Sequence, residues 1–290
     1  MNIVKIMVLA IVQGAAELLP VSSSAHVIIA EKLLGLDPTS PEMTLLLVML
    51  HTGTMFAVIV CFWSAWKRSF FGSRKVFLDS AKYITVATIF TAVIGLFLKF
   101  LIEKLIWRDV PHAEIELLFG NLLLISISLA SVGILIMVAG WKGRQRQGTN
   151  KGLDTRRSSW IGIVQGLCLP FRGFSRSGAT ISTGLLLGVE KTRVEEFSFA
   201  LAVVLTPPVI AREILRLLKA QHVDVMTSAS TMSLFYPSLL GMILSFASGI
   251  LALRWLSNWL ERGRWHLFGI YCVCASLVVF LLHMTIFQVK

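Results

Sequence analysis

One segment near the N-terminus places several chemically competent side chains within an otherwise apolar sequence. Gln13 and Glu17 are four residues apart, so on a helix they project from the same face. Pro20 ends that helix, and the run Ser22-Ser23-Ser24 can cap the next one. His26 follows one turn later, close to the serines. The segment therefore gathers a carboxylate, hydroxyl groups and an imidazole around a helix N-terminus, where free N–H groups favour an anion.

Each of these residues also has a simpler explanation. Helix capping alone would account for Ser22, Ser23 and Ser24. A purely structural role is harder to assign to Glu17, because an ionisable side chain at bilayer depth is costly and is functional by default. His26 taken alone is ambiguous, and its neighbours favour a role in a site.

A second segment, residues 170–180, has the composition of an anion site. Its glycines let the backbone approach a ligand closely, and the planar guanidinium of Arg176 suits phosphate oxygens. The alternative is a cytoplasmic loop with ordinary topological arginines, but the flanking apolar sequence argues against it. The residues that could contact an anion here are Arg172, Gly173, Ser175, Arg176, Ser177, Gly178 and Thr180.

The two segments together predict a site for a phosphorylated ligand. A carboxylate repels a phosphate unless a cation lies between them. We therefore expect Mg²⁺ or Ca²⁺ to be held by Glu17 and by phosphate oxygens.

The elements that must position these segments are membrane helices. The chain is 56% hydrophobic and only 15% charged. A spanning helix needs about 20 mostly apolar residues, and six stretches qualify. The remaining apolar stretches, 3–36 and 158–190, are broken in their middle by polar residues, Pro and Gly, which predicts two re-entrant helical hairpins. The expected spans are 43–66, 83–102, 117–140, 197–218, 234–253 and 266–287.

The loop charges predict the orientation. Loops 67–82, 141–157 and 254–264 are rich in Lys and Arg, whereas 103–116 and 220–233 are not. The first three are therefore expected in the cytoplasm, with both termini outside it. This topology also accounts for the net charge of +11, and no basic stripe with interleaved aromatics indicates nucleic-acid binding.

A short repeat relates the two halves of the chain. The sequence Ile-Val-Gln-Gly at 11–14 recurs at 163–166, and each copy begins a broken hairpin. Each half, 1–140 and 158–290, then holds one hairpin and three spans. Because three is odd, the second half must be inverted in the membrane. The prediction is one all-α membrane domain over 1–290, with its site near the midplane where the hairpins meet.

Two further features are interpreted as structural. The four cysteines all lie in apolar stretches without a second ligand pair, so a zinc site is not expected. The N-terminal apolar run is interrupted by Gln13 and Glu17 and lacks a clear cleavage site, so we expect it to be retained rather than removed as a signal peptide.

The motifs resemble those of the undecaprenyl-diphosphate phosphatase family, the bacitracin-resistance membrane phosphatases, and the similarity extends over nearly the whole chain. Gln13-x-x-x-Glu17 followed by Pro20-Val21-Ser22-Ser23-Ser24-Ala25-His26 is similar to the first family motif. Residues 173–180 are similar to the second, and 50–54 and 196–199 also match family stretches. Two positions depart from the pattern: Gln13 stands where many members have Glu, and Arg172 where a Pro usually precedes the glycine.

This resemblance implies an activity and a role for each residue. The reaction would be hydrolysis of undecaprenyl diphosphate to the monophosphate in the bacterial cytoplasmic (inner) membrane, which recycles the carrier lipid for wall synthesis and confers bacitracin resistance. Ser23 would be the nucleophile or would position a water, His26 the acid or base, Glu17 a metal ligand or base, and Arg176 the transition-state clamp. The residues implied in substrate binding are Gln13, Ser22, Ser24, Arg172, Gly173, Ser175, Ser177, Gly178 and Thr180.

Two other classes of function compete with the enzyme. A transporter or flippase of a polyprenyl phosphate lipid would share the inverted repeat and the broken helices. A scaffold for wall synthesis would leave a buried Glu17 and Arg176 unexplained. The implied nucleophile and acid or base favour the enzyme. The identity of the metal, the face of substrate entry and the oligomeric state, a homodimer included, stay open.

Overall fold

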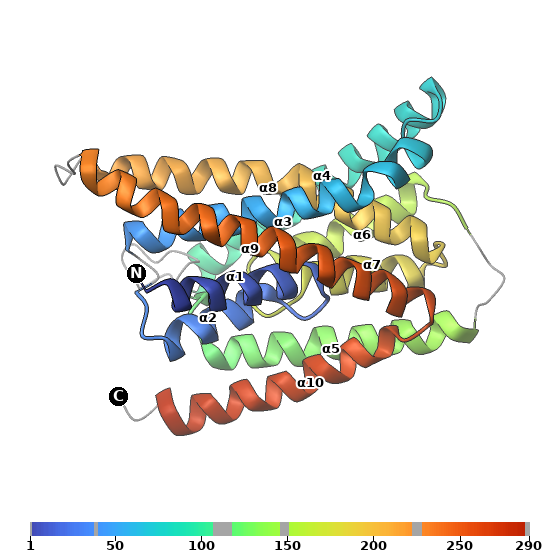
Figure 1. The fold of residues 1–290 in the computed structure, drawn as a ribbon. Helices are drawn as coiled ribbons and strands as arrows, with labels where there is room; N and C mark the ends of the chain where they lie inside the picture. The colour runs from blue at the N-terminus through green and yellow to red at the C-terminus, as the bar shows by residue number, and fades with distance from the viewer. Residues whose placement is uncertain (1, 38–39, 107–117, 146–150, 222–227, 288–290) are drawn as a thin grey trace. The chain divides into compact units, whose positions relative to one another are not determined.

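The computed structural model describes residues 2–37, 40–106, 118–145, 151–221 and 228–287. Within these ranges the regular elements are helices, and the one strand-like contact is an isolated bridge between Lys151 and Val189. The all-α prediction is therefore confirmed. The helices are α1 (Ile3–Leu18), α2 (Ser23–Leu33), α3 (Pro41–Ser69), α4 (Arg74–Leu101), α5 (Leu122–Gln145), α6 (Thr155–Cys168), α7 (Arg176–Leu186), α8 (Lys191–Gln221), α9 (Ser228–Glu261) and α10 (Trp265–Leu282) (Figure 1).

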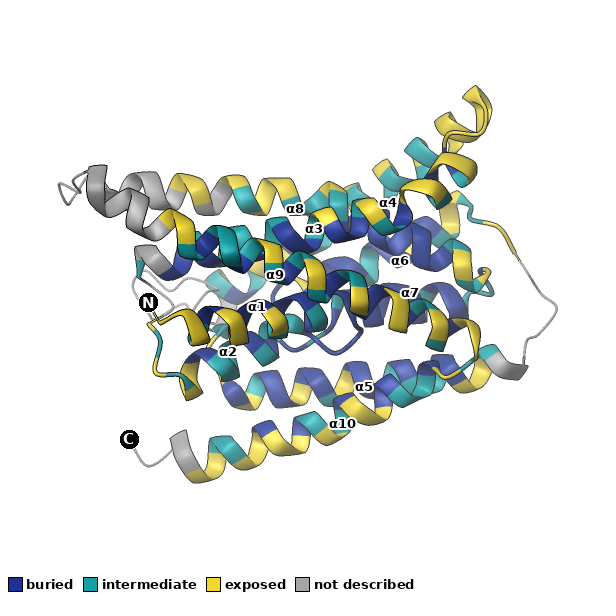
Figure 2. Ribbon diagram, viewed as in Figure 1, coloured by how far each residue is buried: buried dark blue, intermediate teal, exposed yellow. Residues whose placement is uncertain are grey.

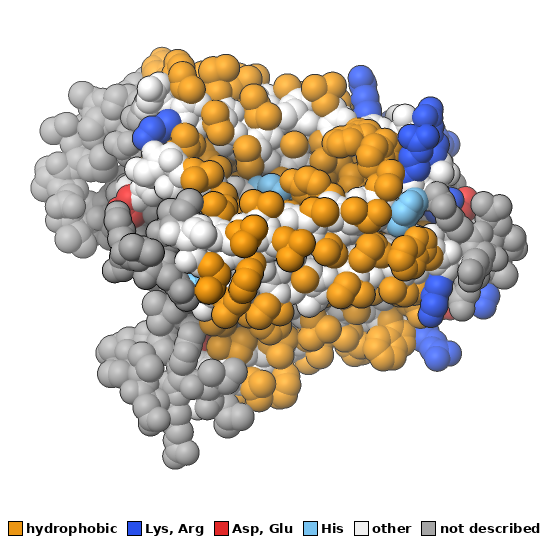
Figure 3. All heavy atoms as spheres, turned by 90° about the horizontal axis from the view of Figure 1, so that it is seen from below, with side chains coloured by type: hydrophobic (Ala, Val, Ile, Leu, Met, Phe, Trp, Pro, Cys, Tyr) orange, Lys and Arg blue, Asp and Glu red, His pale blue; other side chains and the backbone are white. Residues whose placement is uncertain are grey.

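Six helices in the described ranges are long and apolar enough to cross a membrane. They correspond one to one with the six predicted spans, so the protein is a multi-pass membrane protein. Many of their apolar side chains face outward, as lipid-facing residues must: Leu96, Leu251 and Leu277 are 66%, 67% and 59% exposed. Figure 2 shows buried and exposed residues side by side on the long helices, and Figure 3 shows hydrophobic side chains spread over the face that it presents.

The boundaries of the helices differ from those of the predicted spans, and α9 for example continues to Glu261 rather than ending at 253. Helix α4 begins at Arg74 rather than at 83, because the Ser73 hydroxyl caps it by accepting a hydrogen bond from the Val76 N–H at 3.3 Å. Lys75 and Lys82, which we expected in a loop, therefore lie in the first turns of α4. Helix α8 begins at Lys191, six residues before the predicted start of its span.

Two pairs of short helices lie where the hairpins were predicted. Helices α1 and α2 have 16 and 11 residues and pack on each other, as do α6 and α7 with 14 and 11. None of the four reaches the length of about 20 residues that a span requires. The connections contain left-handed residues, Ser22 with φ 67° and Gly173 with φ 100°. Re-entry of these hairpins into the membrane stays a prediction.

The chain divides into two compact units, and the first contains residues 1–19, 23–64 and 202–256. Its core joins α1, α2 and α3 through Ile6, Leu9, Ala10, Val27, Met43, Leu46 and Leu50. Helix α9 packs closely on α1 at Gly14, where a Cβ atom would lie 2.5 Å from the Ser245 carbonyl oxygen. This unit holds the helix that carries Gln13 and Glu17.

The second unit contains residues 20–22, 65–201 and 257–290. In it α5 packs on α10 and α7, and α4 packs on α6. At Gly166 a Cβ atom would lie 2.9 Å from the Thr91 carbonyl oxygen of α4. Each copy of the repeated Gln-Gly pair thus packs on the second long helix of the other half of the sequence. Such reciprocal packing between the two halves of the sequence agrees with an inverted repeat, but the inverted repeat itself stays a prediction.

Candidate active site

Three side chains of the first unit surround one oxygen of the Glu17 carboxylate. Gln13 and Glu17 share a face of α1, and Gln13 Nε2 donates to Glu17 Oε2 at 3.3 Å. The hydroxyl of Ser23, the first residue of α2, donates a hydrogen bond to the same oxygen. The break between the two helices therefore brings the predicted carboxylate and a predicted serine into direct contact.

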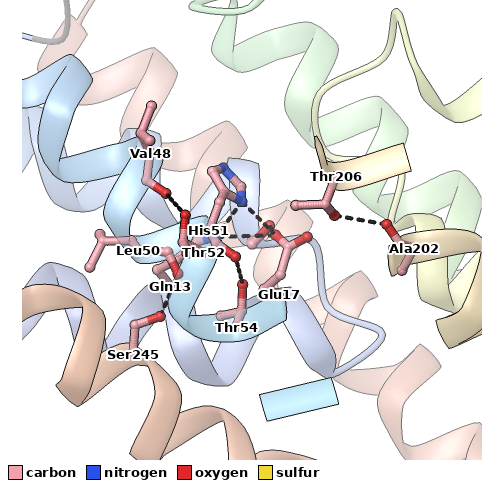
Figure 4. A network of polar contacts seen from close by, with 11 residues as sticks. Gln13, Glu17, Val48, Leu50, His51, Thr52, Thr54, Ala202, Thr206 and Ser245 are labelled. Carbon is pink, nitrogen blue, oxygen red and sulfur yellow. Dashed lines mark hydrogen bonds and ion pairs between the residues drawn. The ribbon is translucent and has the colours of Figure 1, made fainter. Parts of the chain in front are cut away.

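His51 of α3 completes this cluster; it lies in the family-like stretch 50–54 but was not among the predicted site residues. Its Nδ1 lies 3.0 Å from Gln13 Nε2 and 4.0 Å from Glu17 Oε2 (Figure 4). A signal was present, since 43–66 contains no Asp, Glu, Lys or Arg and His51 interrupts an otherwise apolar span. The cluster of Gln13, Glu17, Ser23 and His51 is called the Glu17 cluster below.

The Glu17 cluster is sheltered without being sealed. Gln13 is buried, whereas the side chains of Glu17 and His51 are 16% and 33% exposed. A carboxylate in such surroundings interacts strongly with a nearby charge, because little water screens it. A ligand can nevertheless reach its partly exposed side.

The remaining residues of the first motif lie on or beside α2. Ser22 is buried in its left-handed conformation, while Ser24 and His26 are half-buried on the first turns of the helix. The Ser23 hydroxyl points to a carboxylate and thus does more than cap the helix. The chemical role of this serine stays a prediction.

The second motif forms the turn into α7, in the second unit. Ser175 caps α7, since its Oγ accepts from the Gly178 N–H at 3.2 Å and lies 3.4 Å from Ser177 Oγ. Arg176 is the first residue of the helix and is half-buried. Its positive charge thus lies at a helix N-terminus, where backbone N–H groups and the helix dipole also favour an anion.

Other predicted residues of this turn have contacts of their own. The Arg172 guanidinium lies over the Phe119 ring, 4.2 Å from its centroid, in a cation–π contact. The Thr180 hydroxyl donates to the Arg176 carbonyl oxygen at 2.8 Å and lies 2.6 Å from Ser198 Oγ of α8. Thr180 is fully buried, so it links the turn to α8.

The two glycines of the turn are closely packed. A Cβ atom at Gly173 would lie 2.5 Å from the Ile125 carbonyl oxygen of α5, and the residue also has a positive φ. At Gly178 a Cβ atom would lie 2.8 Å from Ile136 Cδ1. Gly173 therefore requires glycine for its close approach to α5, whereas at Gly178 the nearest atom is the end of the Ile136 side chain, which can move.

The donors around Glu17 suit a cation that takes most of its ligands from a substrate. Among the described residues, no three His, Cys, Asp or Glu side chains are grouped to hold a metal ion. The Glu17 cluster offers one carboxylate and one hydroxyl as oxygen donors, whereas Gln13 presents its amide nitrogen. Mg²⁺ is commonly bound by one or two carboxylates together with substrate phosphates, so this set fits it.

The Glu17 cluster belongs to the first unit and the Arg176 turn to the second. The structure defines the geometry of each. That both act on one ligand stays a prediction.

Comparisons with known proteins agree along the whole chain. A family model described as bacitracin resistance protein BacA matches residues 6–278. Undecaprenyl-diphosphatase 2 of Acinetobacter baylyi is 56% identical over 282 residues, which cover 96% of this chain and 97% of that protein. Undecaprenyl-diphosphatases of Korarchaeum cryptofilum and Parabacteroides distasonis are 29% and 30% identical, over 96% and 94% of this chain and 98% and 95% of theirs.

Proposed function

Because the chain belongs to the bacitracin resistance protein BacA family, we propose that it hydrolyses undecaprenyl diphosphate to undecaprenyl phosphate and inorganic phosphate. Family membership confirms the resemblance seen in the two motifs. The observation that carries the proposal is the Ser23 hydroxyl, which donates to the Glu17 carboxylate in a cluster that a ligand can reach. A hydroxyl hydrogen-bonded to a base is the arrangement that an activated nucleophile requires.

The hydrogen bond between Ser23 and Glu17 supports Ser23 as the nucleophile of the proposed reaction rather than as a residue that positions a water. Glu17 accepts the Ser23 proton as Oγ attacks the terminal phosphorus, and the bond from that phosphorus to the bridging oxygen breaks. Undecaprenyl phosphate leaves with the bridging oxygen. A water then attacks the phosphorus of the phosphoserine, with His26 as the base that receives the water proton. The bond from phosphorus to Ser23 Oγ breaks, Glu17 returns its proton to Oγ, and inorganic phosphate is released.

Arg176 and its turn have the complementary role. Phosphoryl transfer depends mainly on positioning and on neutralising charge, which a guanidinium at a helix N-terminus supplies. The backbone of the turn, capped by Ser175, would bind phosphate oxygens together with Arg176. Arg172, held over Phe119, would attract the anionic head group.

The proposed cofactor is a divalent cation, Mg²⁺ or Ca²⁺, bound by Glu17 and by the diphosphate. When bound it neutralises charge on the phosphate oxygens. Ser23 Oγ offers the nearest additional oxygen donor. Glu17, if it holds such a cation, would no longer repel the phosphate oxygens of the substrate.

The proposed location is the bacterial cytoplasmic (inner) membrane, where the lipid substrate resides. The six apolar helices supply the bilayer contact that a polyprenyl chain requires. In that membrane the product would be available again as a carrier for wall synthesis, and removal of the diphosphate would account for resistance to bacitracin.

The activity is tested directly by product analysis. Purified protein in detergent with Mg²⁺ should convert undecaprenyl diphosphate into equal amounts of inorganic phosphate and undecaprenyl monophosphate, and a chelator should suppress the conversion. Undecaprenyl phosphate is the control substrate and should release no phosphate. Transport of the diphosphate lipid across vesicles without phosphate release would contradict the proposal and favour a carrier.

A further inference from the structure

The amide of Gln13 lies between two hydrogen-bond acceptors. Its Nε2 is 3.3 Å from Glu17 Oε2 and 3.0 Å from His51 Nδ1. An amide nitrogen carries two N–H donors and cannot accept a hydrogen bond. The side chain is only 2% exposed, so both donors need partners within the protein.

The carboxylate decides the orientation of this amide. If Gln13 were turned over, its oxygen would face Glu17 Oε2 at about the same separation, and two acceptors would repel each other. The NH₂ group therefore faces Glu17 and gives it one N–H. The second N–H points to His51, so Nδ1 of that ring must supply a lone pair and the ring proton must be on Nε2.

The backbone around both residues is held in place. A Cβ atom at Gly14, next to Gln13, would lie 2.5 Å from the Ser245 carbonyl oxygen, and one at Gly53 would lie 2.3 Å from that of Met242. The Ser245 hydroxyl also donates to the Leu50 carbonyl oxygen at 2.7 Å. Helices α1 and α3 are thus both held against α9, so Gln13 and His51 approach each other on rigid elements.

We propose that His51 and Gln13 are positioning residues that orient Glu17 for its reaction with Ser23. His51 accepts one N–H of Gln13 and so directs the other N–H to Glu17 Oε2, the oxygen that also receives the Ser23 hydroxyl. The effect on turnover rests on the proposed function. The donor and acceptor roles of His51, Gln13 and Glu17, and the tautomer of the His51 ring, rest on the geometry alone.

Substitutions at His51 separate this role from simple space filling. In His51→Asn the amide oxygen takes the place of Nδ1 as an acceptor, so we expect kcat within about threefold of wild type. His51→Leu keeps bulk but removes the acceptor, and kcat should fall by about 10- to 100-fold with little change in KM, as for a misplaced catalytic group. Equal losses in Asn and Leu variants would overturn the proposal.

A matched control and a double-variant cycle complete the kinetic test. Thr52→Val removes the neighbouring hydroxyl, which donates to the Val48 carbonyl oxygen at 2.7 Å, and should leave kcat within about twofold. Gln13→Leu combined with His51→Leu should cost little more than either alone, because the two act as one unit. If the double variant lost kcat by the product of the two single losses, the proposal that His51 acts through Gln13 would be contradicted.

A spectroscopic measurement tests the tautomer without any substrate. In protein labelled with ¹⁵N at its six histidines, the His51 resonances are identified by their absence in His51→Asn. At about pH 8, where a histidine is ordinarily neutral, we expect an unprotonated Nδ1 and a protonated Nε2, with the Nδ1 shift changed by Gln13→Leu. A protonated Nδ1, or no response to Gln13→Leu, would overturn the proposal. This measurement involves no turnover, so it tests the hydrogen bond between Gln13 and His51 even if the protein proves not to be a phosphatase.

Discussion

Gln13 and Gln165 occupy the same place in the two copies of the repeated sequence, yet their amides make different contacts. Gln13 donates to Glu17 and approaches His51. Gln165 is fully buried, and its Nε2 donates to the Thr91 hydroxyl of α4 at 3.1 Å. Among the described atoms its Oε1 has no hydrogen-bond partner. The second amide therefore joins two helices, whereas the first serves the candidate site.

The two arginines of the second hairpin should differ in their kinetic effects. Arg176→Lys keeps the positive charge but loses the planar fork, and arginines that stabilise phosphoryl transfer are worth about 10³- to 10⁵-fold in rate. We expect kcat to fall by at least about 10²-fold in Arg176→Lys. Arg172→Ala should mainly raise KM, because its loss weakens ground-state and transition-state binding together. Steady-state kinetics of both variants measure the difference.

The contact between Arg172 and Phe119 supplies a matched control for this comparison. Phe119→Leu preserves an apolar side chain but removes the ring face beneath the guanidinium. If this contact positions Arg172, Phe119→Leu should raise KM in the same direction as Arg172→Ala while leaving kcat nearly unchanged. A lower kcat in Arg172→Ala, together with a preserved kcat in Arg176→Lys, would show that Arg172 rather than Arg176 stabilises the transition state.

At the scale of elements, the sequence predicted what hydrophobicity and helix-breaking residues determine. The six spans follow from uninterrupted apolar length, and the two helix pairs follow from Pro, Gly and Ser in the middle of apolar stretches. The start of α4 was missed, because a single serine cap at Ser73 extends a helix through residues whose charges indicate a loop. A helix cap acts over a single turn, so the number of charged residues in a segment does not indicate it.

The Glu17 cluster was predicted only in part, for a related reason. Gln13, Glu17 and Ser23 are neighbours in the sequence, so local helix geometry brings them together. His51 reaches them from α3 through tertiary contacts, and no local pattern specifies which turn of a long apolar helix will face Glu17. The role of Gly14 and Gly53 in close helix contact is likewise a tertiary property.

Close contact between α1 and α9 makes Gly14 a critical position. In Gly14→Ala the new methyl group would lie 1.8 Å from Ser248 Oγ, which can rotate, and 2.5 Å from the Ser245 carbonyl oxygen, which cannot. We expect destabilisation by about 1–3 kcal/mol, as for overpacking in a filled interior. Thermal unfolding in detergent measures the effect.

Gly143 provides the comparison for this substitution. It lies within α5, and a Cβ atom there would have no neighbour within 4 Å in the described part of the structure. Gly143→Ala should therefore leave the unfolding temperature unchanged or raise it slightly, because alanine favours a helix. A loss of stability at Gly143 equal to that at Gly14 would show that the cost is not steric.

At the scale of the whole molecule, the distribution of charge predicts the orientation in the membrane. The loop charges predict that residues 141–157 lie in the cytoplasm and 103–116 outside it. The C-terminal residue, Lys290, is predicted to lie outside the cytoplasm, but it is not among the described residues. Gly120 and Gly152 are exposed and have room for a side chain, so they can report on the two faces.

Cysteine labelling at these two positions tests the topology. In a variant lacking the four native cysteines, a membrane-impermeant maleimide added to intact cells with a permeable outer membrane should label Gly120→Cys. Gly152→Cys should react only after the inner membrane is disrupted. The reverse pattern would overturn the predicted orientation, and labelling of both from outside would contradict the number of crossings between them.

The Ile-Val-Gln-Gly repeat relates the two hairpins, and each repeated glycine packs on a long helix of the other half of the sequence. The proposed chemistry requires the Glu17 cluster and the Arg176 turn to act on the same diphosphate. The proposal therefore requires that Glu17 and Arg176, although they belong to different units, contribute to the same catalytic step.

The most direct test of the central claim is phosphate release from undecaprenyl diphosphate by the Glu17→Gln variant. The substitution preserves size but removes the base that receives the Ser23 proton, so we predict a loss of at least about 10²-fold with the unfolding temperature preserved. Glu103→Gln makes the same chemical change at a carboxylate that pairs with Lys99 at 3.8 Å and should leave the rate unchanged. Phosphate release by a folded Glu17→Gln protein at a rate near that of wild type would contradict the account.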